Sequence, residues 1–392
     1  MPPRTFEKTH PWVNFKLDLN NASHQFWMLL GEARSKCEHI AGVPLLPADA
    51  QALYDVYLTK GVHATTSIEG NTLSENEVGK RVAGRLDLPS SREYLGREVD
   101  NIVEACETIK QDVLERPTLS LTPERICQFN KIVLQRLHVD EDTTPGEFRR
   151  HSLGVAGYRG APAKDCPYLV GRLCDWLSGP EFSSSDRDMS FVLALIKAVL
   201  AHLYIAWIHP FGDGNGRTAR LIEFQLLVQS GLVPFPAGHL LSNHYNKTRT
   251  RYYRELDRTS KSGGDVLPFL FYAVEGFVDG LREQLESIRE RQYRDIWLNY
   301  VHNHFRDDDS ATARRWKHVL LDMPPGPVGR SAIAEISPRV ASHYATRGER
   351  TLTRDLAKLT ELGWLRREGR AYVANRDVIL AFLPPKVEEA EG

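Results

Sequence analysis

The sequence lacks an excess of either charge, since its 392 residues include 50 Lys and Arg against 51 Asp and Glu. Such a chain has no general electrostatic attraction to nucleic acid or to a membrane surface, so any such preference must come from a local patch. It also lacks a CxxC pair, which excludes a disulfide framework and a cysteine-based zinc site and favours reduced thiols in the cytoplasm. The five scattered cysteines are Cys37, Cys106, Cys127, Cys166 and Cys174.

Little in the sequence indicates export or a membrane span. The N-terminus up to Phe15 has no apolar stretch of the signal-peptide type, so we expect no export. The run from Phe191 to Ile208 is of borderline length for a bilayer span, but Lys197 and His202 interrupt it. A buried central helix explains this run better, and we predict no membrane partner.

Most of the chain has the apolar periodicity of helices, and the length suffices for two or three domains. Helical spacing is found over residues 49–68, 97–113, 123–137 and 266–305. A helix should begin near Glu75, because Ser74 and Glu77 have the spacing of a capping box. Thr122 before Pro123 is a further N-cap signal. The run 266–305 is long for one helix, and we expect it to break near Gly276 to Gly280.

The helical pattern fails between residues 145 and 167, a stretch that contains four glycines. Weak alternation from Ser152 to Val155 suits a short hairpin or flap. Leu153, Gly154 and Val155 would then form an edge to which a target peptide can add as an extra strand. A plain surface loop explains the pattern equally well.

The composition becomes basic after residue 310, with 13 Lys and Arg against 6 Asp and Glu between Ser310 and Arg376. Helices are predicted at 313–321, 331–336 and 351–362, with a loop before the last, followed by a hairpin that turns at Glu368-Gly369. This is the layout of a winged helix-turn-helix. Arg350, Thr353, Arg354 and Lys358 would face DNA from the recognition helix, with Arg366, Arg367 and Arg370 in the wing. Protein contacts or dimerisation explain such a domain equally well.

The segment His209–Arg220, HPFGDGNGRTAR, gathers the residue types of a phosphate site between two apolar helical runs. A Gly-rich loop that opens a helix presents N–H groups and the positive end of the helix dipole to an anion. Gly214, Asn215 and Gly216 would allow close approach of phosphates. Arg217 and Arg220 would clamp them from the following helix.

Three further residues of this segment have distinct expected roles. His209 lies four residues from an acid, which favours a general base over a structural histidine. Asp213 would repel a phosphate unless a cation lay between them, so we expect it to bind Mg²⁺. Phe211 should anchor the loop in the core.

The segment resembles the Fic family signature HPFx[D/E]GNGRxxR at every defined position, with Gly212 and Thr218 at variable ones. The resemblance covers roughly residues 45–290. It implies an all-helical core that transfers AMP from ATP to a Ser, Thr or Tyr hydroxyl of a target protein, with His209 as the base and Asp213 holding Mg²⁺. The expected nucleotide-binding residues are Phe211, Gly212, Asp213, Gly214, Asn215, Gly216, Arg217, Arg220 and Tyr252. Tyr252 and Tyr253 would stack on the base of the nucleotide, although core packing explains this pair equally well.

Upstream, TTSIEGN (Thr65–Asn71) resembles the family's inhibitory motif [S/T]xxxE[G/N]. Thr65 and Glu69 stand at its defined positions. The resemblance implies that Glu69 reaches Arg220 and occupies the space that the γ-phosphate of ATP needs. Without the resemblance, Glu69 would be an exposed carboxylate at a helix end.

We therefore predict a mainly α protein with a Fic-type helical core, a short β-hairpin flap and a C-terminal winged helix-turn-helix. The expected parts are an N-terminal region with the inhibitory motif (1–110), the core (111–290), a linker helix (291–310) and the winged helix (311–392). The predicted function is a cytoplasmic, Mg²⁺-dependent protein adenylyltransferase that Glu69 inhibits. One alternative is removal of AMP from a modified protein, and another is a DNA-binding regulator whose core senses nucleotide. The target, the nucleotide base and homodimer formation stay open.

Overall fold

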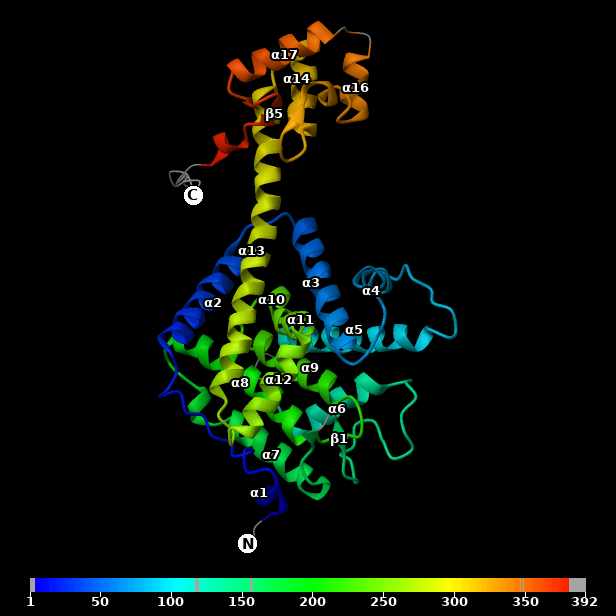
Figure 1. Ribbon diagram of the computed structural model, residues 1–392, viewed down its shortest axis with the longest axis vertical. Coiled ribbons are helices and arrows are strands. Elements are labelled where there is room, and N and C mark those ends of the chain that lie inside the picture. Colours follow the sequence, from blue (N-terminus) through cyan, green and yellow to red (C-terminus); the bar gives the residue numbers. More distant parts are fainter. Residues whose placement is uncertain (1–3, 117–119, 156–157, 346, 348, 381–392) are drawn as a thin grey trace. The chain divides into compact units, whose positions relative to one another are not determined.

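The computed structural model describes residues 4–116, 120–155, 158–345, 347 and 349–380. The chain divides into two compact units, one up to Glu286 and the other from Ser287 on. The inhibitory motif and the signature segment, far apart in the sequence, both belong to the first unit. Helices make up most of each unit (Figure 1), as the periodicity predicts.

The first unit consists of twelve described helices, the start of a thirteenth and one small hairpin. Its helices are α1 (Thr5–Thr9), α2 (His24–Gly42), α3 (Pro47–Ile68), α4 (Glu75–Val82), α5 (Glu93–Glu115), α6 (Pro123–Leu134), α7 (Cys166–Leu177), α8 (Arg187–Ile208), α9 (Asn215–Gln229), α10 (Phe235–Gly238), α11 (Leu240–Lys247) and α12 (Arg249–Lys261). Strands β1 (Gly154–Val155) and β2 (Tyr158–Arg159) pair antiparallel, with Gly154 opposite Arg159. The 3-10 turns Ala163–Asp165 and Pro180–Phe182 precede and follow α7.

Helices α8 and α9 form the centre of the first unit. Helices α2 and α7 pack against α8, and α3, α5 and α6 pack against α9. Among the described residues, α8 is the one helix long and apolar enough to cross a membrane, but 78% of its most apolar window is buried inside the protein. The sequence-based prediction of a buried central helix is therefore confirmed. Its burial fixes the position of the signature segment that follows it.

Local capping signals set where the surrounding helices begin and end. The predicted capping box at α4 is present, because Ser74 and Glu77 satisfy each other's backbone N–H groups. Thr122 caps α6 ahead of Pro123, also as predicted. Helix α3 ends at Ile68, and Gly70 follows in the left-handed region with φ of 103°. Glu69 is thereby placed at the very end of α3.

Helix α13 (Leu267–His304) runs without a break, so the predicted interruption near Gly276 to Gly280 is wrong. The two glycines serve close packing instead. A Cβ at Gly276 would overlap the ring of His244, and one at Gly280 would lie 3.1 Å from a methyl group of Leu240. Both positions face α11, and the absence of side chains lets α11 approach.

The second unit has the predicted order of helices followed by a hairpin. Its elements are the end of α13, α14 (Ala311–Asp322), β3 (Val328–Gly329), α15 (Arg330–Ile333), α16 (Pro338–Tyr344), α17 (Glu349–Glu361), β4 (Leu365–Glu368), β5 (Ala371–Ala374) and a 3-10 turn, Arg376–Ile379. The sheet order is β3-β5-β4. Helix α16 lies where a loop was expected, and its signal is Ser337, which caps the helix ahead of Pro338. Residues 381–392 of the predicted domain lie outside the described residues, and a winged helix stays a prediction.

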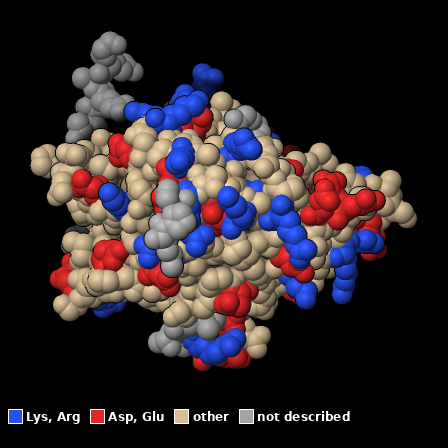
Figure 2. Space-filling model, turned by 90° about the horizontal axis from the view of Figure 1, so that it is seen from below, with Lys and Arg blue, Asp and Glu red and all other residues tan. Residues whose placement is uncertain are grey.

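The charged side chains on one face of the protein agree with the balanced composition. On the face that Figure 2 shows, basic and acidic side chains are interspersed. Charge on this face therefore does not select for one type of partner.

Candidate active site

The segment between α8 and α9 turns through two residues in the left-handed region, His209 with φ of 51° and Gly214 with φ of 76°. His209 ends α8, and its N–H donates to the carbonyl of Ile205 at 2.9 Å. A non-glycine residue pays roughly 1–2 kcal/mol for this conformation. Its occurrence at the predicted base is typical of a functional site.

Asn215 shapes the loop from within. Its Oδ1 accepts from the N–H of Phe211 at 2.9 Å, and its Nδ2 donates to the carbonyl of Phe211 at 2.8 Å. Phe211 is buried and stacks on Phe148, with ring centroids 5.6 Å apart, so it anchors the loop as expected. The side-chain amide of Asn215 is thus occupied inside the loop. The phosphate contacts expected from this region would come from backbone N–H groups.

Arg220 joins the signature segment to the inhibitory motif. Its Nη2 donates to Glu69 Oε1 at 2.7 Å and to the carbonyl of Thr65 at 3.0 Å. Its Nε donates to Thr65 Oγ1, also at 3.0 Å. The side chain of Arg220 is 1% exposed, whereas that of Glu69 is 32% exposed and lines a cavity. The predicted pairing of Glu69 with Arg220 is present in the structure.

The Glu69 carboxylate also lies against the first turn of α9. A Cβ at Gly216 would overlap Glu69 Oε1 and lie 3.1 Å from Arg220 Nη1. Burial by itself raises the pKa of Glu69, but the charge of Arg220 and its hydrogen bond outweigh burial and hold the pKa below its usual value. An ionised carboxylate therefore occupies the helix end at which a phosphate was expected.

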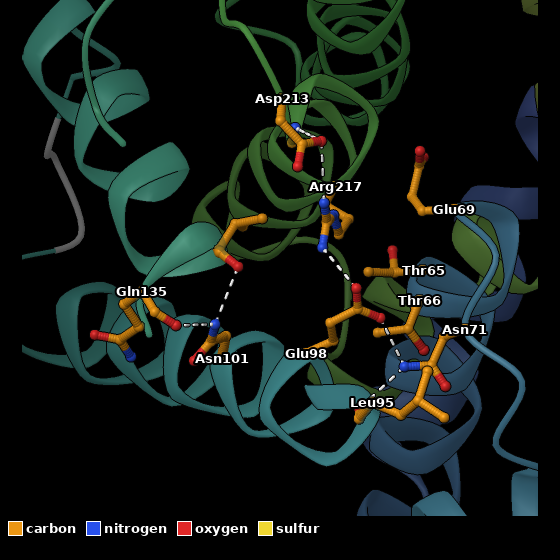
Figure 3. A network of polar contacts seen from close by, with 12 residues as sticks. Thr65, Thr66, Glu69, Asn71, Leu95, Glu98, Asn101, Gln135, Asp213 and Arg217 are labelled. Carbon is orange, nitrogen blue, oxygen red and sulfur yellow. Dashed lines mark hydrogen bonds and ion pairs between the residues drawn. The ribbon is translucent and has the colours of Figure 1, made fainter. Parts of the chain in front are cut away.

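Arg217 lies between two carboxylates. Its Nη2 donates to Asp213 Oδ1 at 3.3 Å and its Nη1 to Glu98 Oε1 at 3.5 Å, as Figure 3 shows. The side chain of Arg217 is 7% exposed and that of Asp213 is 51% exposed. Asp213 is thus accessible to a cation. Glu98, on α5, is a contact that the sequence did not predict.

His209 has the protonation state that a base requires. Burial lowers the pKa of His209 to about 4, and the charge of Arg149 also lowers it. The imidazole is therefore neutral near neutral pH and free to accept a proton. Arg149 also ties His209 to the flap region, since its Nε donates to the carbonyl of His209 at 2.7 Å. Its Nη2 donates to the carbonyl of Ala161.

A cavity of about 400 Å³ opens beside these residues. Its lining comprises Glu69, Tyr158, Ala206, Trp207, His209, Gly216, Arg220, Tyr252, Tyr253, Leu256, Asp257 and Lys261. Arg220 and the predicted base thus share the cavity with four aromatic side chains, Tyr158, Trp207, Tyr252 and Tyr253. Tyr252 is 3% exposed, with its hydroxyl 2.8 Å from His202 Nε2, while Tyr253 is 41% exposed. Both rings line the cavity. Packing in the core therefore does not prevent these rings from contacting the base of a nucleotide.

The predicted hairpin is present beside the cavity, although its tip, residues 156–157, lies outside the described residues. Gly160 N–H donates to Leu153 at 3.1 Å and closes the pair. Gly154 then sits at a position where backbone groups point away from the partner strand. On the other strand, the carbonyl of Arg159 lies 2.8 Å from His10 Nε2. Among the residues that the structure describes, the edge of β1 is therefore the one with which an added strand could pair.

Residues 120–227 match the model of the Fic/DOC family. The chain is 30% identical to the protein adenylyltransferase Fic of Drosophila willistoni over 238 residues, which is 60% of this chain and 42% of that protein. Its fold is similar to that of a Fic family protein from Desulfovibrio desulfuricans G20, with a TM-score of 0.56, 18% identity and coverage of 92% of this chain and 98% of that one. This chain is a Fic family protein.

Two further similarities agree with this assignment of the Fic family. The protein adenylyltransferase Fic of Drosophila virilis is 29% identical over 238 residues, 60% of this chain and 44% of that protein. A structure of Fic-1 (residues 134–508) from C. elegans covers 68% of this chain and 74% of that one, with a TM-score of 0.55 and 21% identity. The chain spans less than half the length of these curated Drosophila relatives.

The Fic site uses residues that sequence reasoning missed. Asn130, on α6, is fully buried; its Nδ2 donates to the carbonyl of Asp213 and its Oδ1 accepts from the N–H of Gly146, both at 2.9 Å. Glu98 and Arg149 also contact the signature segment from far away in the sequence. A buried polar residue on an otherwise apolar helix face was the one available signal for Asn130, and its partners were not foreseeable.

Proposed function

We propose that this Fic protein transfers AMP from ATP to a hydroxyl side chain of a target protein, and that Glu69 inhibits the transfer. The contact between Glu69 and Arg220 at the first turn of α9 carries the proposal, because it lies in a cavity of the size that holds small-molecule ligands. The names of the Drosophila relatives, protein adenylyltransferases, support the reaction type.

In the proposed reaction His209 accepts the proton of the target Ser, Thr or Tyr hydroxyl. The hydroxyl oxygen forms a bond to the α-phosphorus of ATP, the bond from that phosphorus to the bridging oxygen breaks, and pyrophosphate leaves. Arg217, Arg220 and the N–H groups at the start of α9 would stabilise the phosphate charge. Holding the two reactants in line would supply much of the rate.

Asp213 fits a Mg²⁺ ligand. Mg²⁺ in phosphoryl-transfer sites is usually held by one or two carboxylates together with substrate phosphates. The half-exposed carboxylate of Asp213, beside the phosphate-binding loop, matches that donor set. The bound ion would neutralise phosphate charge.

The inhibited state follows from competition for Arg220. Glu69 supplies a carboxylate where the γ-phosphate of ATP would otherwise lie, and the two anions exclude each other. Thr65 supports this state, since its hydroxyl and carbonyl both accept from Arg220. A target strand would add at the edge of β1, through Leu153, Gly154 and Val155.

The test compares the chain and its Glu69→Gly variant with ATP labelled either at the α- or the γ-phosphate. The variant should attach the α-label to protein and leave the γ-label in solution, and a further His209→Ala change should abolish labelling. No α-label on any protein, with ATP binding intact, contradicts the transferase. Release of AMP from a labelled target by the unaltered chain, lost in Glu69→Gly, would instead support the reverse reaction.

For the second unit, we propose DNA binding through α17 and the β4–β5 hairpin. Arg350, Arg354 and Arg370 are exposed and make no ion pair among the described residues. Lys358 and Arg366 are each engaged with an acid, Glu361 and Asp377. These three arginines, on α17 and in the hairpin, could therefore form ion pairs with the phosphates of a DNA duplex.

Binding to a mixed-sequence duplex at several salt concentrations tests this. Arg354→Ala should weaken binding and reduce the slope of log K against log salt concentration by about 1. Arg306→Ala, a control outside α17 and the hairpin, should change neither. Equal binding by both variants, or no binding, would contradict it. The proposed setting is the cytoplasm, in line with five free cysteines.

A further inference from the structure

Glu98 connects two parts of the site that the proposed function treats separately, the Arg217 guanidinium and the end of the inhibitory segment. Its Oε1 accepts from Arg217 Nη1 at 3.5 Å, and its Oε2 accepts from Asn71 Nδ2 at 2.7 Å. Figure 3 shows this chain of contacts from Asp213 through Arg217 and Glu98 to Asn71. One carboxylate on α5 therefore links Arg217 on α9 to the segment that follows α3.

The Arg217 guanidinium is buried but incompletely bound. Its contacts to Asp213 and Glu98 are long, at 3.3 and 3.5 Å. Its Nε is buried and has no hydrogen-bond partner among the described residues. A buried cation with an unused donor gains free energy when an anion arrives, because the unmade hydrogen bond is costly. This geometry fits an arginine whose unused donor can bind a phosphate.

The two carboxylates at Arg217 differ in solvent exposure and in how firmly hydrogen bonds hold them. The Asp213 side chain is 51% exposed, and that of Glu98 is 20% exposed. Asn71 holds Glu98 and is itself fixed, since its Nδ2 also donates to the carbonyl of Leu95 and its Oδ1 accepts from the N–H of Leu73, both at 3.0 Å. When the Asp213 carboxylate binds a cation, Glu98 is the anion that still compensates the buried charge of Arg217.

We propose that Glu98 is the positioning residue for Arg217, keeping its guanidinium charge-compensated and directed at the nucleotide phosphates while Asp213 is engaged elsewhere. The proposal rests on the proposed function for the identity of the ligand, a nucleoside triphosphate. Glu98 itself touches no reacting atom and acts through Arg217.

A double-mutant cycle on the affinity for ATP, measured by calorimetry with Mg²⁺ in the Glu69→Gly background, tests the proposal. Glu98→Gln should raise the Kd about tenfold, as expected for the loss of a charged hydrogen-bond partner. In a chain that also carries Arg217→Ala, the same change should have almost no further effect. Glu104→Gln, an exposed position farther along α5, is the matched control and should leave the Kd unchanged.

Asn71→Ala provides a second variant should Glu98→Gln fail to fold. It keeps the Glu98 charge but removes the bond that orients it, and it should raise the Kd in the same direction by a smaller factor. Additive effects of Glu98→Gln and Arg217→Ala would reduce Glu98 to a structural contact and overturn the proposal. Tighter ATP binding by Glu98→Gln would also overturn it, by showing that Glu98 competes with phosphate. If Glu98→Gln and Arg217→Ala have non-additive effects on the Kd for ATP but no AMP is transferred, the role of Glu98 is supported and only the proposed function is contradicted. If the chain does not bind ATP, both proposals are contradicted.

Discussion

Glu69 and Arg220 form an ion pair of 2.7 Å across 151 residues of sequence, between the end of α3 and the first turns of α9. The arginine is almost completely buried, and the carboxylate lines the cavity. A buried guanidinium needs an anion, and here the chain supplies its own. Under the proposed function, a ligand that brings a phosphate to this place would displace Glu69.

Gly216 should be essential for any anion at this helix end. A Cβ there would overlap Glu69 Oε1 and crowd Arg220, so Gly216→Ala removes the space that a carboxylate or a phosphate would fill. We expect the ATP affinity of the Glu69→Gly chain to fall about tenfold or more when Gly216→Ala is added. Equilibrium binding measures this. Gly171→Ala, where a Cβ meets nothing within 4 Å, is the control, and equal effects of the two changes would count against a shared anion site.

Thr65 should stabilise the buried arginine. Thr65→Val removes the hydroxyl that accepts from Arg220 Nε and leaves that donor unsatisfied, a cost of about 1–3 kcal/mol. Denaturant unfolding followed by tryptophan fluorescence should show the loss. Thr65→Ser, which keeps the oxygen, should be close to the unaltered chain. A Thr65→Val chain as stable as Thr65→Ser would refute the role of this bond.

Acidification should affect transfer only well below neutral pH. His209 must be neutral to accept a proton, and burial lowers its pKa to about 4, so it stays neutral at every pH well above that value. For the Glu69→Gly chain, kcat/KM should therefore show no His209 titration between about pH 6 and 8 and should fall as the pH approaches 4. An inflection near the ordinary histidine pKa of 6.5 would contradict the burial of this ring.

Asn130 should hold the signature loop in its active shape. It is fully buried and bonds both the carbonyl of Asp213 and the N–H of Gly146, so Asn130→Ala leaves two backbone groups unpaired. We expect kcat/KM of the Glu69→Gly chain to fall at least about tenfold, through misplacement of the loop. Steady-state kinetics measures this. Unchanged kinetics, with the variant folded, would show that the loop keeps its shape without Asn130.

Signals that act over a few residues were predictable from the sequence, and long-range contacts were not. The capping box at Ser74, the Thr122 cap and the burial of α8 follow from short patterns. The pairing of Glu69 with Arg220 came from a family resemblance. Glycines that serve close packing resemble helix breakers in sequence, which is why the unbroken α13 was missed. Asn130, Arg149 and Glu98 contact the signature segment across 60 to 119 residues of sequence, which no periodicity reveals.

The most direct measurement compares the affinities of the unaltered chain and of Glu69→Gly for ATP and for ADP. Glu69 is proposed to occupy the place of the γ-phosphate alone. The substitution should therefore tighten ATP binding about tenfold or more, equivalent to ~1.4 kcal/mol, and leave ADP binding nearly unchanged. Equal ATP affinity in both chains, or an equal gain for ADP, would contradict competition between Glu69 and the γ-phosphate for Arg220.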